Sequence, residues 1–165
     1  MRMVQAYLSG PIVNTSLRKD GFYHVVIETL EELGIAVFAP QFRPRLPPSD
    51  VFKRDTNEVR MSDFLVAEVS SPSLGVGMEI MLAIELVKPV LMFHQKNSTE
   101  ISFMALGADG KALFEYESAH DVRTILVERN LENLMVQQCP SCSSQVVEVT
   151  DEGLQCIVCR HTVTV

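Results

Sequence analysis

The sequence has no tryptophan and no cysteine before residue 139. Its longest apolar runs, such as residues 87–93, contain a lysine and a proline and fall far short of the roughly 20 residues of a membrane-spanning helix. The residues before Gly10 contain too few apolar side chains for a secretory signal. These absences exclude an integral membrane protein and a disulfide-rich secreted domain, and they predict a cytoplasmic protein with no membrane partner.

Positive charge is also scarce, with 14 Lys and Arg against 21 Asp and Glu and a formal net charge of -7. Proteins that bind nucleic acids usually gather Lys and Arg on one face, so the charge balance disfavours DNA or RNA as a partner and favours a small ligand. An apolar content of 47% over 165 residues is sufficient for one compact domain with a small appendage. Ordinary usage of glycine and proline, 8 of each, excludes fibrous and disordered classes.

Apolar stretches of strand length alternate with amphipathic stretches of helix length along most of the chain. The expected strands are residues 4–8, 35–38, 64–69, 89–93 and 112–116. The expected helices are residues 22–33, 49–61, 78–86, 101–106 and 120–134. Gly34 is placed to end the first helix, and the proline-rich residues 39–48 are expected to form a loop without regular structure. The alternation predicts an α/β fold with a doubly wound parallel sheet, in which ligands bind at the carboxyl ends of the strands.

All four cysteines lie near the end of the chain, as two Cys-x2-Cys pairs separated by 13 residues. The four residues are Cys139, Cys142, Cys156 and Cys159. This spacing is typical of a tetrahedral zinc site, although a redox pair or inert thiols remain open from spacing alone. Four sulfur ligands leave no position for a water molecule, so we expect a structural Zn²⁺ rather than a catalytic one. The sequence thus predicts a zinc ribbon at residues 135–165 after an α/β domain at residues 1–134.

The run 70–79 brings small residues and a carboxylate to the start of an expected helix. Ser73, Gly75 and Gly77 would let backbone N–H groups approach an anion such as phosphate, although glycines also make ordinary turns in such sheets. Glu79 follows in an otherwise apolar helix. It is either a first-turn residue that the helix dipole stabilises or a buried functional group.

Other candidate groups are two aspartates and a tyrosine. We expect Asp55 and Asp63 near the ends of the second and third strands, where they would converge with Glu79. Paired carboxylates can divide the work of nucleophile and general acid at an anomeric carbon. The alternatives are an exposed helix residue for Asp55 and a turn or cap for Asp63. Tyr7 is either a donor that orients a carboxylate or a core tyrosine.

Four segments together resemble the nucleoside 2-deoxyribosyltransferase family. They are residues 7–12, the Asp55 and Asp63 pair spaced by eight, residues 66–79 and residues 101–107. Within the family the resemblance is closest to the 2'-deoxynucleoside 5'-monophosphate N-hydrolases, and it covers about residues 4–133. It implies a flavodoxin-like fold and a homodimer with composite sites.

The resemblance also implies roles for individual residues. Glu79 matches the nucleophile that attacks C1' of the sugar, Asp55 the acid that protonates the departing base, and Tyr7 the group that positions the nucleophile. Asp63 matches an aspartate that lines the site, and no cofactor is implied for catalysis. The residues implied around the substrate and its 5'-phosphate are Ser9, Gly10, Ile12, Ser73 and Gly75, with Ser102 from the neighbouring subunit.

Two features depart from the family pattern. After Ile12 the hydrolases have an arginine and two glycines, whereas this chain has Val13, Asn14 and Thr15. A contact to phosphate or sugar is therefore lost unless an arginine from elsewhere replaces it; the candidates are Arg18, Arg43 and Arg45. The zinc ribbon is the second departure, and it is open whether it braces a dimer, covers the site or docks a partner.

Three functions follow from these residues. The first is hydrolysis of the N-glycosidic bond of a deoxynucleoside or nucleoside 5'-monophosphate. The second is exchange of the base between deoxynucleosides. The third, in a different class, is a module that binds a nucleotide without turning it over.

Overall fold

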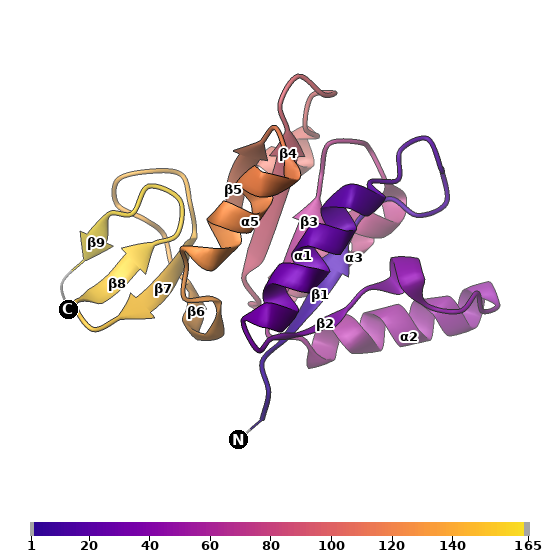
Figure 1. Cartoon of the computed structure of the whole chain (residues 1–165), viewed down its shortest axis with the longest axis horizontal. Helices are drawn as coiled ribbons and strands as arrows, with labels where there is room; N and C mark the ends of the chain where they lie inside the picture. The colour runs from indigo at the N-terminus through magenta and orange to yellow at the C-terminus, as the bar shows by residue number, and fades with distance from the viewer. Residues whose placement is uncertain (1, 164–165) are drawn as a thin grey trace.

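A five-stranded parallel sheet forms the centre of the molecule, and a smaller antiparallel sheet lies beside it (Figure 1). The computed structural model describes residues 2–163. The parallel strands are β1 (Gln5–Ser9), β2 (Ala36–Phe38), β3 (Phe64–Glu68), β4 (Val90–Gln95) and β5 (Lys111–Tyr116). The helices are α1 (Asp20–Glu32), η1 (Pro40–Phe42), α2 (Pro48–Met61), α3 (Leu74–Glu85), α4 (Phe103–Leu106), α5 (Ala119–Val127) and η2 (Leu131–Asn133). The antiparallel strands are β6 (Leu134–Val136), β7 (Val146–Thr150), β8 (Gly153–Cys156) and β9 (Thr162–Val163).

The order of the parallel strands is β2-β1-β3-β4-β5, which is the order of flavodoxin-like doubly wound sheets. Strand β1 is the switch point, since β2 pairs with one of its edges and β3 with the other. The register places Tyr7 of β1 between Phe38 of β2 and Leu65 of β3. The predicted fold class is therefore confirmed, and β1 lies where ligands bind in such folds.

Helices cover both faces of the parallel sheet. Side chains of α1 and α5 join one buried cluster with Leu8 and Val66, whereas side chains of α2 and α3 join a second cluster with Tyr7 and Leu65. Because successive residues of a strand point to opposite faces, Tyr7 and Leu8 separate into the two clusters. Tyr7 is thereby directed toward α3, the helix that carries Glu79.

The helices around the switch point begin earlier than expected. Helix α2 starts at Pro48, because proline fits the first helical position, where no N–H is required. Helix α3 starts at Leu74, since the Ser73 side chain caps it by accepting from the Val76 N–H at 3.5 Å. The expected helix start at residue 78 is therefore wrong, because residues 74–77 are already helical. The prediction that residues 39–48 have no regular structure is also wrong, because Pro40 begins the short helix η1.

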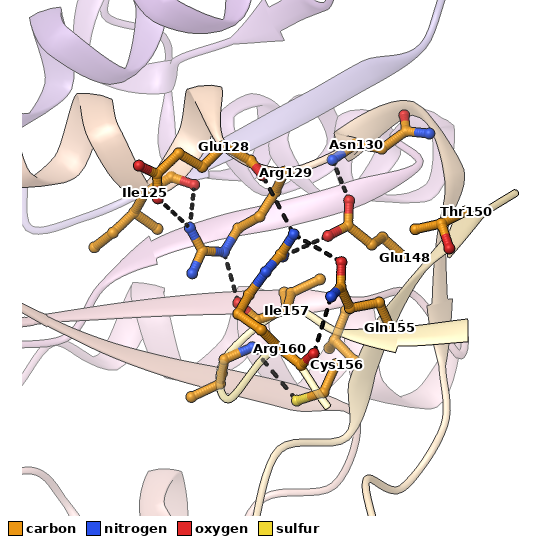
Figure 2. Close-up of polar contacts among 12 residues, drawn as sticks. Ile125, Glu128, Arg129, Asn130, Glu148, Thr150, Gln155, Cys156, Ile157 and Arg160 are labelled. Atoms are coloured by element: carbon orange, nitrogen blue, oxygen red, sulfur yellow. Dashed lines mark hydrogen bonds and ion pairs between the residues drawn. The ribbon is translucent and has the colours of Figure 1, made fainter. Parts of the chain in front are cut away.

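The end of α5 also differs from expectation. The predicted helix 120–134 ends at Val127, and the chain continues through η2 into β6. The Arg129 guanidinium bonds the Ile125 carbonyl at 2.7 Å and the Ile157 carbonyl at 2.6 Å. Arginine often satisfies helix-end carbonyls in this way. Here it ties the end of α5 to the second sheet (Figure 2).

The second sheet shares a core with the first. Val146 and Ile157 are fully buried in the same cluster as the α1 and α5 side chains. The Gln145 N–H donates to the Lys111 carbonyl of β5 at 2.8 Å, so the antiparallel unit adjoins the edge strand of the parallel sheet. Strand β6 begins at Leu134, next to the expected domain boundary. Between residues 2 and 163 no helix has the length and apolar character needed to cross a membrane.

Gly10, directly after β1, is held against a tyrosine. A Cβ at this position would lie within 2.7 Å of Tyr23 Cζ, and the Tyr23 hydroxyl is fixed by its 2.7 Å hydrogen bond to the Pro11 carbonyl. We therefore expect Gly10→Ala to lower the free energy of unfolding by about 1–3 kcal/mol, because the buried ring must move. Thermal unfolding measures this loss. Gly21→Ala is the control, since a Cβ at Gly21 meets nothing within 4 Å, and equal effects of both changes would contradict the prediction.

Candidate functional site

A carboxylate held by two hydroxyls lies at the carboxyl end of β1. The Tyr7 hydroxyl donates to one oxygen of Glu79, and the Ser9 hydroxyl donates to the other at 3.0 Å. Tyr7 and Ser9 are fully buried, and Glu79 is partly buried. The structure thus brings together three of the predicted site residues.

The position of Glu79 in its helix decides whether it is a first-turn residue that the helix dipole stabilises or a buried functional group. Helix α3 begins at Leu74, so Glu79 is the sixth helical residue and lies beyond the first turn. The helix dipole acts mainly within that first turn. The reading as a dipole-stabilised first-turn residue is therefore wrong, and the buried hydrogen bonds favour a functional carboxylate.

Burial changes the acidity of this pair. Burial raises the pKa of Glu79 from 4.5 to about 7; the hydrogen bonds from Tyr7 and Ser9 oppose the rise, and the negative charge of Asp55 adds to it. The pKa of Tyr7 is raised well above 10, first by burial and then by the neighbouring Glu79 charge. Tyr7 therefore stays protonated and remains a hydrogen-bond donor to Glu79 across the physiological range.

The nucleophilic role that the family resemblance implies for Glu79, together with its raised pKa, predicts a pH dependence of turnover. Below about pH 7 Glu79 carries a proton and cannot attack, so we expect turnover to increase as the pH rises through 7. Tyr7→Phe removes a hydrogen bond that lowers the pKa of Glu79, and it should move this pH dependence to higher pH. Initial rates between pH 5 and 9 measure the effect. A pH dependence that stays in place in Tyr7→Phe would contradict the assignment.

Asp55 of α2 is partly buried and lies close enough to Glu79 and Tyr7 for its charge to raise both of their pKa values. Its carboxylate forms an ion pair with Arg54 at 2.8 Å. The interpretation of Asp55 as an exposed helix residue is therefore wrong, because its side chain is partly buried. The sequence analysis missed Arg54, although a cation next to a candidate acid is a signal in the sequence itself.

Asp63 does not join this group. It lies directly before β3, where its carboxylate accepts from the Gln5 N–H at 2.8 Å and pairs with Arg2. These contacts are at the amino edge of the parallel sheet, whereas Ser9 and Glu79 meet at the carboxyl edge. The expected convergence of Asp63 with Glu79 is wrong, because a residue that precedes a strand lies at the opposite end from one that follows it.

The other predicted substrate residues follow the carboxyl ends of β1, β3 and β4. Gly10 and Ile12 follow β1, and Ser73 and Gly75 lie at the start of α3. A Cβ at Gly75 meets nothing within 4 Å, so the first turn of α3 is open to solvent. Ser102 occupies the N-cap position of α4, but its exposed side chain makes no hydrogen bond within residues 2–163.

The three candidate arginines have different surroundings. Arg18 bonds Asp20 at 2.6 Å and the Gln41 carbonyl at 2.9 Å. Arg43 stacks on the Phe38 ring at 5.0 Å, and Arg45 is exposed. Arg18 is therefore held within the chain, whereas Arg43 and Arg45 are available to a ligand.

A second buried carboxylate was missed by the sequence analysis. Glu68 is fully buried at the end of β3, where it accepts from the Ser70 N–H at 2.6 Å and from the Tyr116 hydroxyl. The pKa of Tyr116 rises well above 10, mainly through burial and then through this hydrogen bond. An acidic residue inside an apolar strand was the available signal. Its bonds fix the turn that leads from β3 toward α3.

The four cysteines form a separate group. Their Sγ atoms all lie within 4.8 Å of one another, and the pairs Cys139–Cys159 and Cys142–Cys156 are each 3.6 Å apart. Four sulfurs placed at 2.3 Å from a zinc ion would be about 3.8 Å apart, so the cluster fits a tetrahedral metal. Backbone N–H groups also donate to three sulfurs, as thiolate ligands require. The cysteines can therefore hold a metal ion such as zinc.

The cysteine unit, β6 to β9, lies beyond β5, at the opposite end of the strand order from β1 and β2 (Figure 1). Figure 2 shows how it is fastened: Arg160 pairs with the buried Glu148, which also accepts from the Asn130 N–H. The two hydrogen bonds of Gln145 to this edge, with the Lys111 carbonyl and the Gly110 N–H, lie at the amino end of β5. The unit therefore does not cover the Glu79 site of its own chain.

Comparison with known proteins agrees with this geometry. The family model described as nucleoside 2-deoxyribosyltransferase matches residues 6–140. A 5-hydroxymethyl-dUMP N-hydrolase from Rattus norvegicus is 33% identical over 123 residues, covering 73% of this chain and 71% of that protein. An enzyme of the same name from Danio rerio is 38% identical over 81 residues, or 47% of this chain and 57% of that protein.

Solved structures share the fold. A CMP N-glycosidase from Clostridium botulinum superposes with a TM-score of 0.61 at 17% identity, covering 75% of this chain and 98% of that one. A 2-deoxyribosyltransferase from Bacillus psychrosaccharolyticus gives 0.55 at 23% identity, covering 73% and 90%. The family model spans most of the sequence, including the residues that hold Glu79. The chain therefore belongs to the nucleoside 2-deoxyribosyltransferase family.

Proposed function

We propose that the protein hydrolyses the N-glycosidic bond of 2'-deoxynucleoside or nucleoside 5'-monophosphates, giving free base and (deoxy)ribose 5-phosphate. The observation that carries the proposal is the Glu79 carboxylate held by Tyr7 and Ser9 at the switch point of the sheet. Relatives at 33% and 38% identity that bear the name of a nucleotide N-hydrolase support the substrate class.

The reaction has two steps in this proposal. A Glu79 oxygen bonds to C1' while the bond from C1' to the base nitrogen breaks and its electron pair passes to the base. Asp55 is the acid that protonates the base as it leaves. Water then attacks C1' and gives its proton to the Asp55 carboxylate, which restores the acid, while the bond from C1' to Glu79 breaks and releases the sugar phosphate and the Glu79 carboxylate. Tyr7 holds Glu79 in the attacking position throughout.

The phosphate end of the substrate is assigned to the N-terminus of α3. Ser73 and Gly75 lie at its first turn, where backbone N–H groups and the helix dipole favour an anion. Gly10 and Ile12 come from the loop after β1 on the neighbouring strand. Asp63 is left out of the site, because its contacts are at the amino edge.

A second copy of the chain completes the site in this proposal. Helices α3 and α4 leave large apolar side chains exposed: Leu74 at 91%, Met78 at 58%, Phe103 at 85% and Met104 at 82%. Apolar side chains gathered in this way are typical of an interface between subunits. Because Ser102 directly precedes Phe103, a homodimer that buries this surface brings Ser102 to the site of the partner.

The dimer gives a direct prediction. Phe103→Glu places a charge in the interface, and we expect it to convert a dimer into a monomer and to reduce turnover at least tenfold, because Ser102 is withdrawn from the partner. Light scattering after size-exclusion chromatography and initial rates measure both effects. Met135→Glu, at an exposed position on β6, is the control. A wild-type protein that is monomeric and fully active would contradict the prediction.

For the metal, we propose a structural Zn²⁺ held by Cys139, Cys142, Cys156 and Cys159, with no cofactor for catalysis. Catalytic chemistry is assigned to residues 1–134 and the metal to residues 135–165. The cytoplasm is the proposed location, where thiols stay reduced and free to bind a metal.

The experiment that tests the function is chromatography of the base released from deoxy- and ribonucleoside 5'-monophosphates and from the unphosphorylated nucleosides. We expect release from the monophosphates alone, with no dependence on an added acceptor base. Release that requires an acceptor base would replace hydrolysis with base exchange. Binding of monophosphates with no release from any of them would replace it with a non-catalytic module.

A further inference from the structure

Two arginines from different segments lie on one aromatic ring beside Asp55. The guanidinium of Arg43, from the loop after η1, is 5.0 Å from the centroid of the Phe38 ring, and that of Arg54, from α2, is 5.8 Å from it. Phe38 in turn stacks on Tyr7, with ring centroids 5.6 Å apart. Cation–π contacts of this kind hold a guanidinium in place. The two cations are therefore connected through Phe38 to the tyrosine that holds Glu79.

These guanidiniums keep hydrogen-bond donors free. Arg54 uses Nε on Asp55 at 2.8 Å and one terminal nitrogen on the Pro44 carbonyl at 3.1 Å. Its other terminal nitrogen, and the three guanidinium nitrogens of Arg43, have no acceptor within residues 2–163. The net charge of the whole chain is -7, and these two guanidiniums are distinguished from other arginines with free donors by their contact with the Phe38 ring next to Tyr7.

The strand order and the proposed positions of the phosphate and C1' together indicate which end of a nucleotide the two arginines face. Tyr7 lies in β1, with β2 on one side and β3 on the other. Ser73 and Gly75 follow β3, whereas Phe38 belongs to β2. With the phosphate at the start of α3 and C1' at Glu79, the base extends toward β2. Arg43 and Arg54 are then at the base end and not at the phosphate end.

We propose that Arg43 and Arg54 recognise the leaving base and select bases that present carbonyl oxygens over bases that present an amino group at the same position. The proposal rests on the proposed function, since it takes the position of the base from it. The favoured substrates are nucleotides of uracil, thymine, guanine or hypoxanthine, and the disfavoured ones are those of cytosine and adenine.

Hydrogen-bond chemistry explains the selection. A guanidinium has donors only and pairs well with carbonyl oxygens, as in its two-point contact with guanine, whereas an amino group also donates and leaves the arginine without an acceptor. When the bond to C1' breaks, its electron pair delocalises onto the carbonyl oxygens of such a base. Two fixed cations stabilise that charge as it develops.

The test compares kcat/KM for dUMP against dCMP and for dGMP against dAMP. We expect the wild-type protein to prefer the carbonyl-bearing member of each pair at least tenfold, and Arg43→Gln to reduce that ratio about tenfold. Arg54→Lys should reduce it as well, because lysine lacks the planar set of donors. Arg60→Gln is the control, since this exposed arginine lies at the far end of α2.

A binding measurement separates this inference from the function it rests on. In Glu79→Gln protein, calorimetry with dUMP and dCMP reports base preference without turnover, and adding Arg43→Gln should remove that preference. Lost preference in a protein that never releases base would support the arginine assignment and overturn the proposed reaction. Base release with ratios unchanged in Arg43→Gln and Arg54→Lys would overturn the arginine assignment and leave the reaction standing.

Discussion

Glu79→Gln is expected to reduce the release of free base by about 1,000-fold or more, because an amide cannot form the ester with C1'. The side chain keeps its size; its amide oxygen can accept from Tyr7 while its NH2 group donates to the Ser9 hydroxyl oxygen, so the fold should be retained. Loss of activity would then report the missing nucleophile and not a damaged core.

The same variant should be more stable than the wild-type protein at alkaline pH. Burial raises the pKa of Glu79 from 4.5 to about 7, so the folded protein holds a proton that the unfolded chain has released. Stability is therefore lost as the pH rises from 4.5 to 7 and stays reduced above 7. Glutamine carries no such charge, and we expect a gain on the order of 1–3 kcal/mol at pH 8 that disappears toward pH 4.

Thermal unfolding at pH 8 and pH 4, together with base release, measures both effects. Glu85→Gln is the matched control, since Glu85 is the exposed last residue of the same helix. Retention of more than a few per cent of activity in Glu79→Gln would exclude Glu79 as the nucleophile.

Cys142→Ser is expected to release the metal and to lower the free energy of unfolding by about 3 kcal/mol or more. A tetrahedral site that loses one thiolate binds zinc weakly, and the free energy of metal binding is part of the free energy of folding. Val146 and Ile157 would then lose their fixed positions in the shared core. Loss of buried apolar contacts of this size lowers the free energy of unfolding. The whole chain, and not the cysteine unit alone, should therefore become less stable.

Metal content by mass spectrometry and thermal unfolding with and without a chelator measure this outcome. Ser141→Ala is the control, because only the backbone N–H of Ser141 contacts a cysteine sulfur. Base release should remain measurable below the unfolding transition, since the cysteines lie beyond β5 and away from Glu79. A metal-free protein that is folded but inactive would contradict the structural role.

The sequence predicts much of the fold because its signals are local. Apolar stretches mark the five parallel strands, and Gly34 has the positive φ of 79° that a glycine after a helix allows. The spacing of the cysteines predicts their grouping for the same reason. The early starts of α2 and α3 were missed, although Pro48 and Ser73 are local signals as well.

Most features that the sequence did not predict depend on contacts between segments that are distant in the chain. The early end of α5 depends on Arg129 reaching Ile157, 28 residues away, and no periodicity in the helix reveals that contact. A carboxylate in an apolar helix marks Glu79 in the sequence, and the family pattern marks both Glu79 and Asp55; their catalytic roles stay predictions. Asp63 was placed at the wrong edge, although its position just before a strand already indicated the amino end.

The shared core between the two sheets has a consequence for biosynthesis. The parallel sheet leaves the ribosome before Gln145, which donates to the Lys111 carbonyl at the outer edge of β5, and before Val146 and Ile157, which complete the shared core. An open strand edge on a nascent chain invites aggregation and chaperone binding. With a metal in the cysteine cluster, as proposed above, starvation for metal should lower the abundance of the protein, because newly made chains would keep this core incomplete and be exposed to proteolysis.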